Sequence, residues 1–172
     1  MQIYRLPPEE RDFLAAQIGA IARSGQPFPL VFQHGDPGTW NLLVTPQGRP
    51  AFLDWEAAER RGMPLWDLFY FVRSFGIGVA GATGGDTLKA FADQFLFDTA
   101  VSHGLAEVVE RHCERIGIDR SLVEPLFFTC WMHRALKESM RLGSGKLDRG
   151  RYVRLLRLCL ERRDAPALRR AF

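Results

Sequence analysis

HGDPGTWN at residues 34–41 and LDWE at residues 53–56 are the two stretches that decide the fold of this chain. The residues between them are typical of a hairpin with strands at 42–45 and 51–53. Asn41 comes directly before the first of these strands, and Asp54 directly after the second. Because hairpin strands are antiparallel, we expect these two side chains to lie close together.

The residue types in the two stretches suit phosphoryl transfer to an alcohol. That reaction has a loose transition state, so the protein mainly positions groups and neutralises charge. One carboxylate must lie beside the acceptor hydroxyl, and Asp36 is the candidate. Magnesium prefers oxygen ligands, which Asn41 and Asp54 supply. An Asp and an Asn beside a Pro-Gly turn can also serve only to satisfy backbone groups, but the order and spacing of the two stretches favour the catalytic interpretation.

Residues 31–72 resemble the catalytic segment of the aminoglycoside phosphotransferase and choline kinase group, which are relatives of protein kinases. HGDPGTWN resembles the catalytic loop of that family, and LDWE resembles its metal-binding segment. The resemblance implies transfer of phosphate from ATP, with Mg²⁺ as cofactor, to a hydroxyl of a small molecule. Asp36 would be the catalytic base or the residue that orients the hydroxyl. The magnesium ligands would be Asn41 and Asp54.

Two further residues match the family pattern in supporting positions. The resemblance makes His34 a structural member of the catalytic loop. It makes Asp67, within PLWDL, a residue that braces this loop without reacting. Glu56 is open, because it could contact the metal or the substrate, or it could simply favour the start of a helix.

Beyond the hairpin the apolar spacing becomes helical, and we expect no further strand. A first helix is expected from Pro8 to just before Gly25. Later helices are expected at 65–75, 86–103, 105–116, 122–142 and 152–160. The predicted fold class is α+β and mostly helical, a single kinase-like C-terminal lobe over residues 1–172. A small β-hairpin carries the catalytic loop within residues 1–75, and a helical subdomain follows at 76–172.

The glycine-rich stretch 76–85 is expected to connect two helices. Its first six residues, GIGVAG, match the G-x-G-x-x-G pattern of nucleotide-binding loops. The match follows an apolar helix instead of a strand and comes after the catalytic loop, so we do not interpret it as a phosphate loop.

The segment before the catalytic loop is short for this chemistry. Thirty-three residues precede His34, too few for the glycine-rich lobe that covers the nucleotide. The three lysines, Lys89, Lys137 and Lys146, all follow the motif. We therefore expect the N-terminal nucleotide lobe to be absent. The chain would then be the C-terminal lobe of a longer enzyme, or it would work with a separate chain that supplies this lobe, or by self-association. The alternative is a partner-binding or scaffolding module without catalysis.

The composition is that of an ordinary soluble globular protein, with 47% hydrophobic and 25% charged residues. There is no signal-peptide pattern and no apolar run long enough to span a membrane. The three cysteines lack metal-site spacing, so a reducing cytoplasm is the expected compartment. No nucleic-acid motif is present, and no nucleic-acid partner is expected.

The sequence leaves the acceptor open among a sugar, an aminoglycoside-like molecule and an amino alcohol. A cationic acceptor would require carboxylates in the helical subdomain. The candidates are Asp86, Asp93, Asp98, Glu107 and Glu110. Residues 111–172 hold 15 Lys and Arg against 7 Asp and Glu, which favours a neutral or anionic acceptor.

Overall fold

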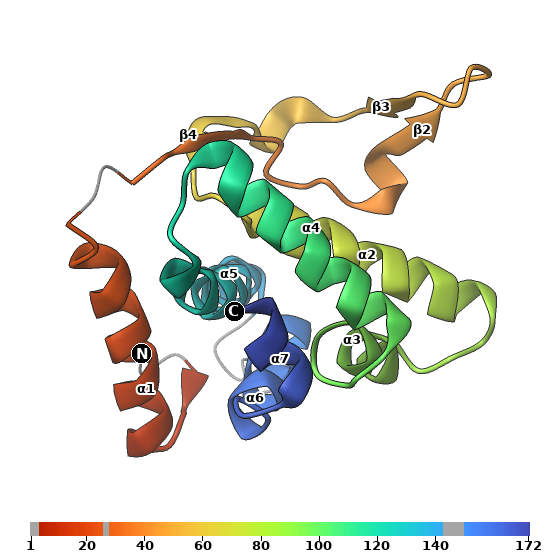
Figure 1. Ribbon diagram of the computed structural model, residues 1–172. Helices are drawn as coiled ribbons and strands as arrows, with labels where there is room; N and C mark the ends of the chain where they lie inside the picture. The colour runs from red at the N-terminus through yellow and green to blue at the C-terminus, as the bar shows by residue number, and fades with distance from the viewer. Residues whose placement is uncertain (1–3, 26–27, 143–149) are drawn as a thin grey trace.

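The computed structural model describes residues 4–25, 28–142 and 150–172, and it shows a helical body with a thin β layer along one side (Figure 1). The helices are α1 (Pro8–Ala22), α2 (Trp66–Ala82), α3 (Thr87–Phe95), α4 (Ala100–Ile116), α5 (Val123–Arg141), α6 (Arg151–Glu161) and α7 (Pro166–Ala171). Single 3₁₀ turns are η2 (Thr39–Asn41), η3 (Trp55–Ala57) and η4 (Arg120–Leu122). The mostly helical α+β class is confirmed. The expected division of the chain after residue 75 stays a prediction, although that residue lies within α2.

The β layer consists of two separate antiparallel pairs. The expected hairpin is present as β2 (Leu42–Val44) and β3 (Pro50–Phe52), with Leu42 opposite Phe52. The second pair joins β1 (Val31–Gln33) to β4 (Glu59–Gly62). The expectation of no strand after the hairpin was therefore wrong. The sequence ERRG of β4 has no apolar alternation, and the strand forms because its backbone pairs with β1.

The expectation of a glycine-rich connector at 76–85 was also wrong, because α2 continues to Ala82. A Cβ atom on Gly76 would lie 2.3 Å from the side chain of Gln94 on α3. Gln94 is buried and donates from Nε2 to the Val72 carbonyl at 2.6 Å. The glycine thus makes room for a helix contact, and the G-x-G-x-x-G pattern lies inside a helix.

The helix expected at 86–103 is two helices. Asp86 caps α3, accepting from the Leu88 N–H at 2.8 Å. Thr99 caps α4, and its side chain and that of Ser102 form a reciprocal capping box. The chain therefore turns between Phe95 and Ala100, and the boundary expected near residue 104 lies inside α4. The short α7 was not expected.

The core lies in the helical body, where the aromatic rings of α2, α3 and α5 meet. Phe127 and Trp131 of α5 are within 1% of complete burial. Phe127 packs edge to face on Phe69, with ring centroids 5.3 Å apart. Within the described ranges, no helix is long and apolar enough to cross a membrane.

Candidate active site

The loop after β1 is held by the start of α2. His34 and Gly35 donate their backbone N–H groups to the Asp67 carboxylate, at 2.6 Å to Oδ2 and 3.2 Å to Oδ1. Burial raises the pKa of Asp67, while these N–H groups act to lower it. Asp67 lies in the first turn of α2, where a helix dipole favours a negative charge. These are the contacts that a bracing residue would make.

The His34 ring is buried and links the loop to the end of the hairpin. Its Nδ1 accepts from the Asp36 N–H at 3.3 Å, so Nε2 carries the proton. That proton is donated to the Leu53 carbonyl at 2.8 Å. The ring therefore fixes Asp36 relative to Leu53, the residue that precedes Asp54.

Asn41 lies against Asp36. Its Nδ2 donates to the Asp36 carbonyl at 3.0 Å and lies 3.5 Å from Oδ2 of the same residue. The Leu53 N–H donates to the Asn41 carbonyl at 2.8 Å, which continues the β2–β3 pairing by one step. The hairpin thus brings Asn41 next to the residue before Asp54.

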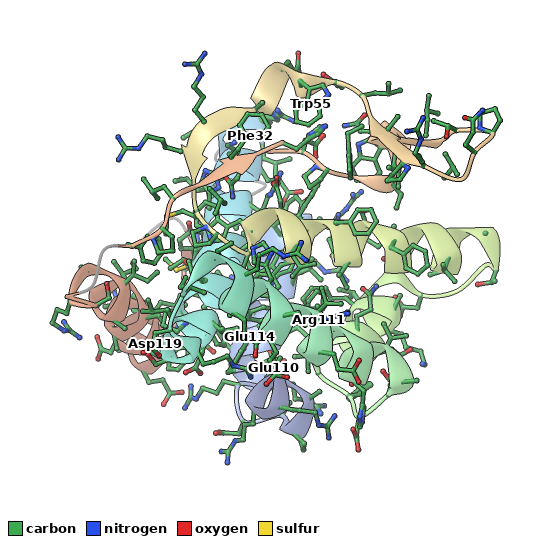
Figure 2. The ribbon with its side chains drawn as sticks, turned by 45° about the horizontal axis from the view of Figure 1, so that its top comes forward. Phe32, Trp55, Glu110, Arg111, Glu114 and Asp119 are labelled. Carbon is green, nitrogen blue, oxygen red and sulfur yellow. The ribbon has the colours of Figure 1, made fainter. Side chains whose placement is uncertain are left out.

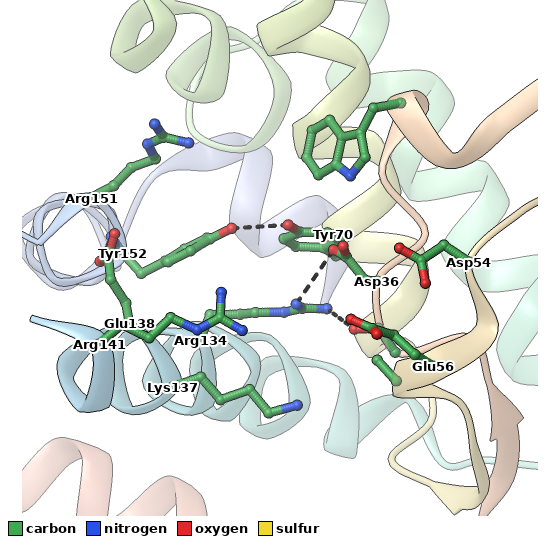
Figure 3. Close-up of a pocket in the computed structure, with 13 residues that line it drawn as sticks. Asp36, Asp54, Glu56, Tyr70, Arg134, Lys137, Glu138, Arg141, Arg151 and Tyr152 are labelled. Atoms are coloured by element: carbon green, nitrogen blue, oxygen red, sulfur yellow. Dashed lines mark hydrogen bonds and ion pairs between the residues drawn. The ribbon is translucent and has the colours of Figure 1, made fainter.

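Asp54 occupies the left-handed region of the backbone, with φ 58° and ψ 70°. Aspartate is among the few side chains that adopt this conformation with modest strain. The turn directs Asp54 toward Asp36, and both carboxylates line one cavity together with Glu56 (Figure 3). The structure therefore gathers Asp36 and Asp54, and it places Asn41 behind Asp36 as a hydrogen-bond partner.

The donor set fits Mg²⁺ only as a partial site. Among the residues described, no group of three or more His, Cys, Asp or Glu side chains is placed to hold a metal ion. Magnesium usually keeps several waters and binds one or two carboxylates plus the phosphates of a substrate. Asp36 and Asp54 supply two carboxylates in the cavity wall, whereas Asn41 lies behind Asp36.

Gly35 brings the loop into contact with the η3 segment. Its φ is +81°, and a Cβ atom built on it would lie 2.1 Å from the carbonyl oxygen of Ala57. A side chain at this position would be strained and would also collide with the backbone. Only a glycine lets the segment with Asp36 lie directly against the segment with Asp54.

The cavity beside Asp36 has a volume of about 420 Å³, within the range of small-molecule sites. The loop, η3, α2, α5 and α6 all contribute to its wall (Figure 3). Its lining residues are Gly35, Asp36, Trp40, Asp54, Glu56, Ala57, Tyr70, Arg134, Lys137, Glu138, Arg141, Arg151 and Tyr152. The acidic residues considered for a cationic acceptor are not in this wall.

Those acidic residues have other positions. Asp86 caps α3, and Asp93 pairs with Lys89 on the same helix. Asp98 contacts His103 at 2.6 Å and Arg170 at 2.8 Å. Glu107 and Glu110 are exposed on α4.

Arg134 of α5 is a site residue that the sequence analysis missed. Its Nη2 donates to the Gly35 carbonyl at 2.7 Å, and its guanidinium lies 3.6 Å from the centroid of the Tyr70 ring. Its Nη1 is 3.9 Å from Oδ1 of Asp36. Arg134 therefore holds the loop through the Gly35 carbonyl, while Asp67 holds it through the His34 and Gly35 N–H groups. The signal for it is a charged face at 134, 137, 138 and 141 on an otherwise apolar helix.

A buried cation also supports the cavity wall. Arg73 of α2 is 1% exposed and donates to the Tyr152 hydroxyl at 3.3 Å. Its Nε and Nη2 have no hydrogen-bond partner in the described parts of the chain, and burial lowers its pKa. The Tyr152 hydroxyl in turn lies 3.1 Å from that of Tyr70. Because the cation polarises Tyr152 as a donor, the O–H of Tyr70 is left to face the cavity.

Comparison with known proteins gives one finding that bears on this geometry. The model of the phosphotransferase enzyme family matches residues 2–104. No curated protein and no solved structure matches the chain. The matched segment contains the loop, the hairpin and Asp67, whereas α5 and α6 lie beyond it.

Proposed function

Since the chain belongs to the phosphotransferase enzyme family, we propose that it transfers the γ-phosphoryl group of ATP to a hydroxyl of a small molecule held beside Asp36. The observation that carries this proposal is the convergence of Asp36 and Asp54 on one cavity, with Asn41 hydrogen-bonded behind Asp36. A decayed scaffold would have no need to keep these three groups together.

In the proposed reaction Asp36 accepts a hydrogen bond from the acceptor hydroxyl and turns its oxygen toward the γ-phosphorus. A bond forms between that oxygen and the phosphorus, and the bond to the β–γ bridging oxygen breaks, so that ADP leaves. The hydroxyl proton passes to Asp36 and then to solvent. Asp54 and Asn41 would hold Mg²⁺, which when bound would neutralise charge on the phosphates.

The neighbours of Asp36 suit this role. Nη1 of Arg134 lies 3.9 Å from Oδ1 of Asp36, so a positive charge faces the carboxylate that accepts the hydrogen bond. Tyr70 shares the cavity, and burial raises the pKa of its phenol, so the hydroxyl stays protonated at neutral pH. Tyr70 can therefore donate a hydrogen bond to an oxygen of the substrate, but it cannot compete with Asp36 as the base.

Nucleotide binding is the first test, by thermal shift of the chain with Mg-ATP, Mg²⁺ alone and ATP alone. A ligand at about 100 times its dissociation constant stabilises the folded state by about 2.7 kcal/mol. At this size each kcal/mol raises Tm by about 2–4 °C. We expect a shift that requires magnesium, is lost in Asp54→Ala and persists in Glu114→Gln, an exposed carboxylate on α4 (Figure 2).

Phosphoryl transfer is the second test, on a panel of alcohols with and without added partner proteins. Asp36→Asn should bind Mg-ATP as the parent chain does and should transfer no phosphate. Full turnover by this variant would remove Asp36 from the mechanism. Loss of Mg-ATP binding in Asp36→Asn but not in Asp54→Ala would reverse the two roles.

A second candidate function, binding of a protein partner, is favoured by the apolar side chains of the β layer. Phe32 is 62% exposed and stacks on Trp55, which is 47% exposed, with ring centroids 5.7 Å apart (Figure 2). Further large exposed side chains of this layer are Trp40, Leu43, Val44, Phe52 and Leu53. Contiguous apolar surface of this kind marks a protein interface. We propose that a second chain covers it, such as one that supplies a nucleotide-covering lobe.

Light scattering and pull-down experiments test this second function. The double variant Phe32→Ser/Trp55→Ser should abolish any association, while Val101→Ser, a half-exposed apolar residue of α4, should not. A parent chain that stays monomeric and captures no partner would count against a binding role.

A further inference from the structure

The cavity beside Asp36 is electrically polarised. Asp36, Asp54 and Glu56 line it from the loop and η3, whereas Lys137, Arg141 and Arg151 line it from α5 and α6, with Lys137 and Arg151 on opposite sides of Tyr152 in the view of Figure 3. A metal ion with its phosphates belongs at the acidic side, near Asp54. The basic side is left for a different group.

Most of the cations near this cavity lie on one face of α5. Arg134, Lys137 and Arg141 are separated by three and four residues, so they share one face of α5. Like charges at such spacing repel one another and destabilise a helix. Arg151 is the first residue of α6, whose first turn has no acidic residue. The dipole of a helix disfavours a cation at that end.

Within the described parts of the chain, these cations differ in whether they have side-chain partners. Arg134 is engaged by the Gly35 carbonyl and the Tyr70 ring. The side chains of Lys137, Arg141 and Arg151 have no hydrogen bond or ion pair with any residue in the described ranges. Glu138, in the same wall, accepts the Tyr152 N–H at 2.8 Å and thereby caps α6. Three cations thus line one cavity with no side-chain partner among the described residues, which is the arrangement of an anion site.

We propose that the acceptor alcohol already carries a phosphate group, which Lys137, Arg141 and Arg151 bind while the hydroxyl lies at Asp36. This inference rests on the proposed function and names its substrate class. Three cations suit a phosphate dianion, and an arginine can bind two of its oxygens at once. Transfer would form a second phosphate ester on the acceptor, with ADP as the other product.

Paired probes test this substrate class on the intact chain. Isothermal titration compares glycerol 3-phosphate with glycerol, and glucose 6-phosphate with glucose, alongside inorganic phosphate. We expect the phosphorylated member of at least one pair to bind and its partner to bind at least tenfold more weakly. Arg141→Gln and Arg151→Gln should each weaken the phosphorylated probe about tenfold, the size of one lost charge-assisted hydrogen bond. Arg111→Gln removes an exposed arginine of α4 and should leave binding unchanged (Figure 2).

The outcomes separate this inference from the proposed function. Equal binding within every pair, or no phosphorylated probe bound at millimolar concentration, overturns the inference. So does an equal loss of Mg-ATP affinity in Arg141→Gln and Arg151→Gln, because the cations would then serve the nucleotide phosphates. Failure of the proposed function is a different result: Mg-ATP does not bind, while the phosphorylated probe still binds through Arg141 and Arg151. An unchanged Tm of both variants without ligand shows that they fold.

Discussion

The helical body and the β layer treat their apolar side chains in opposite ways. In the body, Phe127 is 1% exposed and contacts rings from α2, α3 and the C-terminal residue. In the β layer, Phe32 is 62% exposed, and its aromatic contact is with Trp55, itself half exposed. The body therefore folds around its own core, whereas the layer presents its apolar groups outward.

The difference shows which kind of contact fixes the position of the site. The loop between β1 and β2 is attached to the body by polar contacts from Asp67, Ser74 and Arg134, which bond the backbone of His34, Gly35 and Thr39. Apolar packing provides most of the stability of a domain, but directional hydrogen bonds fix geometry. Stability and site geometry are thus located in different parts of this molecule.

The strongest test of this contrast replaces one phenylalanine in each region. Phe127→Ala should lower the free energy of unfolding by about 3–5 kcal/mol, because it opens a cavity in a close-packed core. Phe32→Ala should change it by less than about 0.5 kcal/mol, as for an ordinary surface substitution. Urea denaturation measures both. Comparable losses would show that the β layer is part of the core after all.

Asp67→Asn should have the next largest effect, because it weakens the contact that joins the two regions. Hydrogen bonds to a charged group contribute about 1.5–3 kcal/mol, and an amide can replace only part of that contribution. Hydrogen exchange should show faster opening at His34 and Gly35. Asp93→Asn is the control, since its ion pair with Lys89 lies at the surface and contributes little. Equal losses in the two variants would contradict the anchoring role.

Arg134→Lys tests a second polar contact between the helical body and the loop. Lysine keeps the charge but loses the planar group that lies over Tyr70 and bonds Gly35. We expect a loss of about 1 kcal/mol in the free energy of unfolding and a larger proportional loss in phosphoryl transfer. Arg154→Lys, an exposed position on α6, should alter neither quantity. A stability loss with unchanged transfer would mean that Arg134 supports the fold alone.

The smallest expected effect is a pH dependence at the boundary of the two regions. His133 of α5 stacks on Trp66. Burial lowers the pKa of His133 below its ordinary value of 6.5, and the positive charges of Lys137 and Arg134 lower it further. The negative charge of Glu59 acts in the opposite direction. As pH falls, the unfolded chain therefore takes up this proton before the folded chain does. The contribution of His133 to the free energy of unfolding is complete above pH 6.5, and it is lost as pH falls through the lower pKa of the folded state.

Replacing His133 by phenylalanine keeps the stacking on Trp66 and removes the titration. Urea denaturation at about pH 7.5 and about pH 5 should give a smaller loss of stability in this variant than in the parent chain. His112, whose pKa burial also lowers, should account for part of the remaining slope. A slope unchanged by His133→Phe would contradict the assignment.

The sequence predicted the hairpin, α1, α5 and α6, and this hairpin brings Asn41 next to Leu53, the residue before Asp54. These features depend on local signals: turn residues, apolar periodicity and the antiparallel geometry of two neighbouring strands. It failed where distant contacts decide. Gly76 lies inside α2, where its lack of a side chain leaves room for Gln94 of α3. The strand β4 forms because it pairs with β1. Arg134 belongs to the site because α5 passes under a loop 99 residues earlier in the chain, which no spacing reveals.

The close approach at Gly35 has a consequence for recognising inactive copies of this chain. Alanine at position 35 would meet the Ala57 carbonyl and push the two halves of the site apart, although Asp36, Asn41 and Asp54 would all remain. A gene survey that checks only the charged residues would score such a copy as intact. The absence of a side chain at residue 35 is therefore as informative about whether the proposed site is intact as any of its carboxylates.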